Sequence, residues 1–177
     1  TGKLETILFY PAMALNMVLT SIVGQCIGGS RFDRANDYLR LALKYGISIL
    51  AVLSFLIILF SKQLSALFVN SNNVAGIVNS YFMIVSIGYI LYTVTSCYMG
   101  TLNGIGKPTK SMVLMIFYYI VIRIPLSYIF SFLNMGLTGI WTAILISHII
   151  ACIATILISN QSFRNLRSLT NHETKKS

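Results

Sequence analysis

Charged residues are scarce in this sequence, and acidic residues are the scarcest. Only 10% of its 177 residues are charged, and four Asp and Glu stand against thirteen Lys and Arg. A soluble domain carries about 25% charged residues, because its whole outer surface faces water. Asp, Glu, Lys and Arg are missing from residues 6–30, 45–61, 63–106, 111–122 and 124–163. A helix that crosses a bilayer needs about 20 mainly apolar residues, so the sequence predicts an integral membrane protein.

The patterns typical of enzymes and metal proteins are also missing. Cys26, Cys97 and Cys152 lack the paired spacing of a zinc site or a disulfide framework, and we interpret them as small packing residues. Ser, His and acidic residues form no catalytic pattern, and the glycine-lysine segment at 104–107 lacks the Ser or Thr of a phosphate-binding loop. We therefore expect no enzymatic activity, no cofactor and no metal site.

The sequence begins without an initiator Met, and its first apolar run is longer than that of a signal peptide. We expect it to be a piece of a longer polypeptide.

The net charge of the sequence, +9, would suggest nucleic-acid binding in a soluble protein. Here the basic residues lie between apolar runs, so membrane topology explains them and we expect no nucleic-acid partner.

Five apolar runs predict an all-α, polytopic bundle of about five transmembrane helices. They cover about residues 6–27, 41–60, 74–102, 112–133 and 137–159, and residues 160–177 form a polar tail. Strands of a membrane barrel would be about 10 residues long and would alternate apolar and polar side chains. Helices also satisfy the backbone hydrogen bonds within each segment, as a lipid environment requires.

Basic residues alternate between successive connections. They gather in the first and third connections and in the tail: Arg31, Arg34, Arg40, Lys44, Lys107, Lys110, Arg164, Arg167, Lys175 and Lys176. The second connection holds only Lys62 and the fourth holds none. Because loops rich in Lys and Arg stay in the cytoplasm, we expect a multi-pass protein of the cell inner (plasma) membrane with a cytoplasmic C-terminus. We also expect Asp33 to pair with Arg34 or Arg40, and Asp37 with Arg40, on an exposed helix surface.

Three segments share an order of glycine, arginine and tryptophan motifs. They are VGQCIGG (23–29) followed by DRA (33–35), GTLNGIGKP (100–108), and RIPLSY (123–128) followed by GLTGIW (136–141). Together they resemble the C-terminal lobe of bacterial multidrug and toxic compound extrusion (MATE) transporters. The resemblance covers nearly the whole chain, and the order and spacing of the motifs make it more specific than any segment alone.

The resemblance implies a twelve-helix transporter of two lobes, of which this chain would hold helices eight to twelve. It implies a secondary antiporter that exports small organic cations, drugs among them, in exchange for sodium or protons. The implied partners are the lipid bilayer, a missing N-terminal lobe, the substrate and the coupling ion. The four acidic residues all lie at span ends or in polar segments, namely Glu5, Asp33, Asp37 and Glu173. A coupling carboxylate would therefore lie in the first lobe.

Four residues are candidates for substrate binding. Arg123 lies near the middle of the fourth span, where a charge costs at least about 2.5–3.5 kcal/mol. It would either face a transport cavity or have a structural role, by snorkelling to an interface or by bonding carbonyls freed by Pro125. Tyr89 and Tyr92 share a helix face and would either bind an organic cation or simply pack. Asn16 would either line the cleft or bond a neighbouring helix. We interpret His148, in the last span, as a hydrogen-bonded residue between helices.

Six further residues, at the expected cytoplasmic turns, are candidates for packing or hinge positions: Gly24, Gln25, Gly28, Gly100, Gly104 and Gly106. Glycine allows helices to pack closely and to bend as two lobes rock. Two alternatives remain open at this stage. One is a flippase for lipid-linked oligosaccharides of the same superfamily, and the other is a truncated membrane protein without transport activity.

Overall fold

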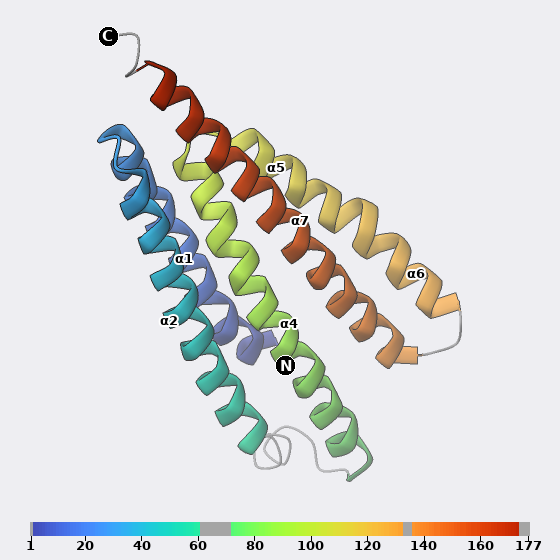
Figure 1. The fold of residues 1–177 in the computed structure, drawn as a ribbon. Helices are drawn as coiled ribbons and strands as arrows, with labels where there is room; N and C mark the ends of the chain where they lie inside the picture. The colour runs from blue at the N-terminus through green and yellow to red at the C-terminus, as the bar shows by residue number, and fades with distance from the viewer. Residues whose placement is uncertain (1, 61–71, 133–135, 174–177) are drawn as a thin grey trace.

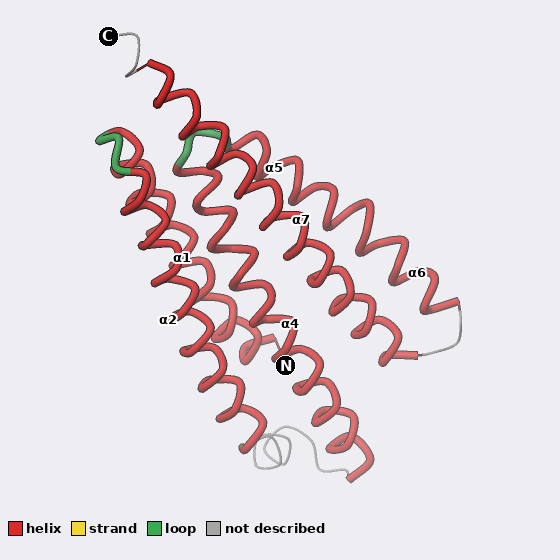
Figure 2. Tube along the Cα trace, viewed as in Figure 1, coloured by secondary structure: helices red, strands yellow, loops and turns green. Residues whose placement is uncertain are grey.

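The computed structural model describes residues 2–60, 72–132 and 136–173, and these are helical apart from two short turns (Figures 1 and 2). In chain order the elements are α1 (Gly2–Gly28), α2 (Phe32–Leu59), α4 (Asn72–Gly104), α5 (Pro108–Ile116), η1 (Phe117–Arg123), α6 (Ile124–Phe132) and α7 (Gly136–Glu173). Here η1 is a π-helical segment that continues from α5 and leads directly into α6. The predicted all-α class is confirmed.

Five helical segments are long and apolar enough to cross a membrane. They are Leu8–Gly28, Phe32–Leu59, Ile84–Gly104, Pro108–Phe132 and Gly139–Ser168. The predicted bundle of five membrane-spanning helices is thereby confirmed. Helix α2 includes the first basic connection from Phe32 onward, and α7 continues through the expected tail as far as Glu173. The exact limits of the membrane domain and the tail stay a prediction, because the end of a helix does not mark the surface of a bilayer.

Helix α4 lies at the centre of the bundle and contacts α1, α2, α5 and α7 (Figure 1). Its buried positions include Thr93, Ser96, Cys97 and Thr101, which are all small side chains. Lipid is as apolar as leucine, so helices in a membrane associate chiefly through close packing and hydrogen bonds, for which small residues are suited. The composition of α4 therefore explains why the other helices gather around it.

Helices α1 and α4 approach each other closely. A Cβ atom added to Gly100 would lie 2.5 Å from the backbone oxygen of Asn16, and one added to Gly104 would lie 2.8 Å from Cβ of Val23. Gly100 and Gly104 are four residues apart and so share one face of α4. This is the small-xxx-small pattern of closely packed membrane helices.

Both short turns lie at the same end of the bundle as the last turns of α7 (Figure 2). They are residues 29–31 between α1 and α2, and residues 105–107 between α4 and α5. Gly106 adopts a φ of +75°, a left-handed conformation that favours glycine. The turns bring Arg31 and Lys107 to one end of the molecule, together with Arg164 and Arg167 of α7. The alternation of basic connections in the sequence thus corresponds to one basic end in space.

Asp33 makes an ion pair that the sequence did not indicate. Its Oδ1 lies 3.2 Å from Nη2 of Arg167, so the carboxylate joins the start of α2 to the last turns of α7. The expected partners were Arg34 and Arg40, which are near Asp33 in the chain. Both members of the observed pair are largely exposed, so we assign it little stability.

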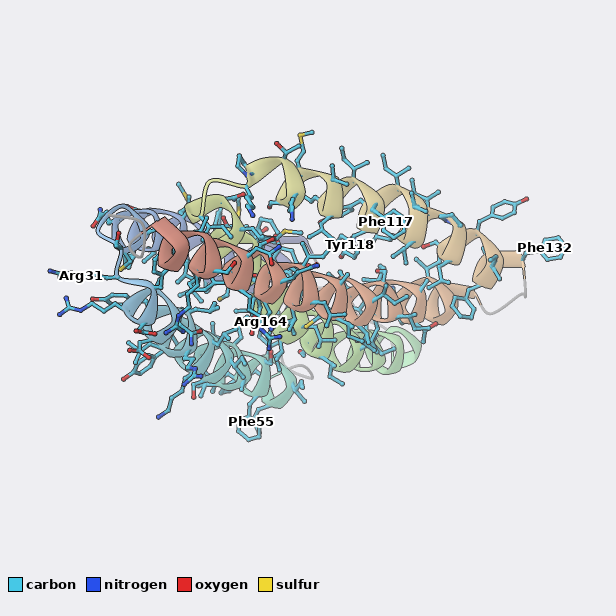
Figure 3. The ribbon with its side chains drawn as sticks, turned by 45° about the horizontal axis from the view of Figure 1, so that its top comes forward. Arg31, Phe55, Phe117, Tyr118, Phe132 and Arg164 are labelled. Atoms are coloured by element: carbon cyan, nitrogen blue, oxygen red, sulfur yellow. The ribbon has the colours of Figure 1, made fainter. Side chains whose placement is uncertain are left out.

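The outer surface of the bundle is apolar. Phe55 on α2 and Phe132 at the end of α6 are 65% and 81% exposed, and both project away from the other helices (Figure 3). An apolar surface of this extent would be unfavourable in contact with water. It is suited to contact with the acyl chains of lipids.

Candidate functional site

A cavity of about 120 Å³ lies between α1, α4, η1 and α7. Its walls are mainly aromatic, and we call it the aromatic pocket. The ring-bearing residues that line it are Phe9, Tyr81, Tyr89, Tyr92, Tyr119, Trp141 and His148. Three of the four residues expected to bind substrate, Tyr89, Tyr92 and Arg123, line this one cavity. Their role as ligands stays a prediction, but the fold brings them together from α4 and η1.

The rings of the pocket contact one another in favourable geometries. Phe9 stacks on Tyr92 with ring centroids 5.3 Å apart, and Tyr89 meets Tyr92 edge to face at 6.3 Å. On the other side, Tyr81 and Trp141 form an edge-to-face pair at 5.1 Å. Such pairs stabilise a packed arrangement by about 0.5–1.5 kcal/mol beyond the area they bury. The rings are therefore held in place and offer a preformed surface to a planar ligand.

Arg123 supplies a positive charge to the pocket. Its guanidinium carbon lies 5.4 Å from the centroid of the Tyr119 ring, within the range of a cation–π contact. Among the described residues that line the pocket, Arg123 is the one Lys or Arg, and none of them is Asp or Glu. The pocket therefore combines aromatic faces with one guanidinium group that can donate to an anionic or carbonyl oxygen.

The local backbone explains how Arg123 and Tyr119 reach the pocket. Residues Phe117–Arg123 form a π-helix, an uncommon widening that occurs frequently at functional sites. Pro125 follows two residues later; proline has no backbone N–H, and its ring displaces the carbonyl four residues earlier. A wider turn accommodates that displacement. The sequence indicated freed carbonyls near Pro125, but it did not indicate the π-helix.

Tyr118 links η1 to α7 beside the pocket. Its hydroxyl lies 2.9 Å from Nδ1 of His148, and its side chain is only 3% exposed. Figure 3 shows Tyr118 between the ribbon of η1 and that of α7. His148 also meets the ring of Tyr92 edge to face, with centroids 5.8 Å apart. The interhelical hydrogen bond predicted for His148 is confirmed. The imidazole of α7 thus contacts both η1, through Tyr118, and α4, through Tyr92.

Asn16 does not line the aromatic pocket. Its Nδ2 donates a hydrogen bond of 2.9 Å to the backbone oxygen of Ser96, and its own backbone oxygen accepts one of 2.8 Å from Thr20 Oγ1. Thr20 Oγ1 also lies 3.2 Å from the backbone oxygen of Gly100. Of the two expected roles for Asn16, the contacts favour bonding between helices over binding of substrate.

The expected packing or hinge residues fall into two groups. Gly100 and Gly104 lie inside α4, and Gly24 faces the backbone oxygen of Gly104, so all three lie where α1 meets α4. Gly28 and Gly106 lie at helix ends, with no atom within 4 Å of an added Cβ. The side chain of Gln25 is exposed and reaches only Ser21 Oγ, at 3.5 Å. Close packing is thus observed for the first group, and hinge motion remains a prediction.

Sequence reasoning missed two residues of the pocket. Phe9 precedes Pro11 near the start of the first span, and nothing in its neighbourhood in the chain indicated a site. In the sequence, Trp141 was noted only as part of the GLTGIW motif, although it is the one tryptophan of the chain. Both join the pocket through contacts between helices, with Tyr92 and Tyr81 respectively. The part of the chain that the structure describes holds no cluster of three His, Cys, Asp or Glu residues suited to a metal ion.

Comparison with known proteins gives consistent matches. A family model described as MatE matches residues 2–129. The chain is 28% identical over 154 residues to the "Probable multidrug resistance protein NorM" of Mannheimia succiniciproducens, covering 84% of this chain and 33% of the relative. It is 23% identical over 168 residues to an "FAD transporter" of Shewanella oneidensis, covering 95% of this chain and 37% of the relative.

Two solved structures share the fold. A multidrug resistance MATE family transporter in an inward-facing conformation has a TM-score of 0.85 and 24% identity, covering 94% of this chain and 39% of that one. A transporter of the same description in an outward-facing conformation has a TM-score of 0.77 and 20% identity, covering 93% and 44%. The chain thus spans about a third of the length of these curated relatives and about two fifths of the length of these structures.

Proposed function

Since the chain belongs to the MATE family of membrane transporters, not to a family of enzymes, we propose that it forms the C-terminal lobe of a secondary antiporter. In this proposal the complete transporter exports aromatic organic compounds, organic cations among them, in exchange for sodium or protons. The lobe would work with an N-terminal lobe, in a plasma membrane with its basic end in the cytoplasm. The order of the three sequence motifs and the alternation of basic connections along the chain support this placement.

The observation that carries the proposal is the aromatic pocket. Its paired rings offer flat, polarisable surfaces between helices α1, α4, η1 and α7. Aromatic faces attract organic cations by about 0.5–2 kcal/mol for each well-placed ring. They bind many planar ligands without requiring one arrangement of hydrogen bonds, which is the property that a polyspecific exporter needs.

Transport measurements on the complete transporter test this proposal. Proteoliposomes would be loaded with a planar aromatic cation, and its movement would be followed under an imposed sodium gradient or an imposed proton gradient. We expect Tyr92→Ala to lower transport of the cation by about 2- to 30-fold, the effect of one cation–π contact. Tyr128→Ala is the matched control, because Tyr128 is 73% exposed on α6 and lies outside the pocket. Equal transport by both variants would reject the aromatic pocket as the substrate site.

A second candidate function is export of an aromatic organic anion, and Arg123 favours it. The pocket holds a guanidinium group and no acidic side chain among its described lining residues. One relative bears the name "FAD transporter", and this name supports an aromatic anion as a second candidate substrate. If the substrate is an anion, Arg123→Gln would abolish transport of FAD while transport of a planar cation persists or increases. If the substrate is a cation, the Arg123→Gln variant would still transport the planar cation in preference to FAD.

The two other possibilities receive less support. A flippase for lipid-linked oligosaccharides would have to accommodate a pyrophosphate, and the aromatic pocket offers one arginine for it. A membrane protein without transport activity would have no use for a preformed aromatic cavity. Failure of the complete transporter to move any aromatic cation or anion under either gradient would favour this last possibility.

A further inference from the structure

A second cavity, of about 300 Å³, opens at the basic end of the bundle between the start of α2 and the last turns of α7. Three arginines line it, Arg40 from α2 and Arg164 and Arg167 from α7. An adjoining hollow at the first turn of α2 adds Arg31 and Arg34, and it shares Phe32, Asp33 and Arg167 with this second cavity. We call the two together the basic cleft.

The basic cleft has a large excess of positive charge. Five arginines face a single carboxylate, that of Asp33, which engages Arg167 at 3.2 Å. Both partners of that pair are largely exposed, so a stronger anion can displace the carboxylate without breaking a buried contact. Arginine is suited to such an exchange, because its planar guanidinium group binds phosphate in a bidentate manner.

The start of α2 adds to the attraction for anions. Arg31 precedes the helix and makes no side-chain hydrogen bond to its first turn. The first backbone N–H groups of a helix have no partner within the helix, and they carry the positive end of its dipole. In this molecule the first residues of α2, Phe32 to Arg34, line the same hollow as Arg31 and Arg167.

The position and the walls of the basic cleft indicate where its ligand comes from. It lies where the candidate spans Phe32–Leu59 and Gly139–Ser168 begin and end. Arginines that flank apolar spans are typically found at the level of the lipid headgroups. The walls of the basic cleft include Phe32, Leu39 and Phe163. Ile153 and Leu157, which precede Phe163 on α7, are also exposed. The acyl chains of a lipid whose headgroup is bound in the basic cleft would therefore meet apolar side chains. A soluble anion would contact the arginines and would make no favourable contact with these apolar walls.

We propose that the basic cleft binds the phosphate of an anionic phospholipid from the leaflet at the basic end of the transporter. The lipid phosphate takes the place of Asp33 on Arg167 and receives further hydrogen bonds from Arg40 and Arg164. Basic pockets between membrane helices are a known means of holding anionic headgroups. The lipid would thereby join α2 to α7, two helices that the Asp33–Arg167 pair also bridges. This site is separate from the aromatic pocket and does not depend on the proposed transport activity.

The test is native mass spectrometry of the complete transporter in detergent, titrated with phosphatidylglycerol or with zwitterionic phosphatidylcholine. We expect preferential retention of phosphatidylglycerol. The double variant Arg164→Gln, Arg167→Gln should weaken this binding by about fivefold for each arginine removed. Asp33→Asn should strengthen it, since it removes the competing carboxylate. Lys107→Gln is the matched control, because it removes one charge at the same end of the bundle and outside the basic cleft.

Three results would overturn the proposal. The first is equal retention of the two lipids, and the second is a loss in Lys107→Gln as large as that in the double variant. The third is displacement of phosphatidylglycerol by millimolar inorganic phosphate, which would indicate a site for soluble anions. If the double variant does not fold, Asp33→Asn decides alone, because unchanged or weaker binding by that variant contradicts the proposed exchange.

Discussion

The hydroxyl of Tyr118 and Nδ1 of His148 lie 2.9 Å apart and join the π-helix to α7 at the edge of the aromatic pocket. The two residues are thirty positions apart in the chain. Tyr118 is nearly inaccessible, and His148 also contacts Tyr92 of α4. This hydrogen bond therefore fixes the position of η1, the element that carries Arg123 and Tyr119.

Tyr118→Phe removes this hydrogen bond and keeps the ring. We expect it to destabilise the transporter by about 0.6–1.7 kcal/mol, the range measured for polar contacts between membrane helices. The measurement is thermal unfolding in detergent. Tyr128→Phe is the control, because it removes the same hydroxyl from an exposed position on α6. Equal midpoints for the two variants would show that the Tyr118–His148 bond contributes nothing to stability.

Gly100→Ala places a methyl group where α1 and α4 are in contact. Its Cβ would lie 2.5 Å from the backbone oxygen of Asn16, so the two helices must move apart. We expect a loss of about 1–3 kcal/mol, as in other overpacked sites, with normal insertion into the membrane. Gly28→Ala adds the same group where no atom lies within 4 Å and should change little. Membrane abundance and unfolding midpoints check both expectations.

Larger substitutions at the same positions test the functional role of the glycines. Gly100→Val and Gly104→Val should impair transport while the protein still reaches the membrane, because the α1–α4 contact requires both backbones to be close. Wild-type transport by either variant would contradict that requirement.

Asn16→Ala distinguishes the two roles expected for Asn16. The hydrogen bond from its Nδ2 to Ser96 predicts a loss of about 0.6 kcal/mol, and at most about 1.7 kcal/mol, in stability. A ligand for the substrate would instead change the apparent KM for transport and leave the unfolding midpoint unaltered. Gln25→Ala is the control on the same helix, since its side chain is exposed and its hydrogen bond to Ser21 Oγ is long, at 3.5 Å.

The orientation of the chain can be tested by labelling single cysteines in intact cells. Cys26, Cys97 and Cys152 would first be replaced by Ala, and then Lys107→Cys or Phe132→Cys would be introduced. Lys107 lies at the basic end and Phe132 at the end of α6, on the opposite side of the fourth span. A membrane-impermeant maleimide should label Phe132→Cys directly, and Lys107→Cys only after the cells are opened. The reverse result would place the basic end outside the cell.

The sequence alone predicted the class of the fold because the signal is local. Each charge-free run is long enough to cross a bilayer, and the requirement that a helix satisfy its own backbone hydrogen bonds does not depend on its neighbours. The family resemblance was also accessible, since short motifs such as GTLNGIGKP keep their order along the chain. The sequence could likewise indicate Tyr89, Tyr92 and Arg123 as unusual residues for a membrane helix.

Other features of the molecule depended on which helices pack against one another. Phe9, Trp141 and His148 come to the aromatic pocket from α1 and α7, and nothing near them in the chain showed that they would meet. Asn16 looked equally suited to a cleft and to a helix contact until the packing placed Ser96 beside it. Asp33 was expected to pair with its neighbours in the chain, and Arg167 of α7 was the partner that the fold provided.

The sequence by itself determined that this protein is a bundle of membrane helices with basic connections, because hydropathy and charge act on each segment separately. The tertiary structure decided which aromatic rings share a pocket with Arg123, which glycines lie between helices, and which arginines surround Asp33. These features arise from contacts between segments far apart in the chain. In a membrane such contacts depend on the shape and hydrogen bonding of whole helix faces, and the hydrophobicity of the chain does not specify them.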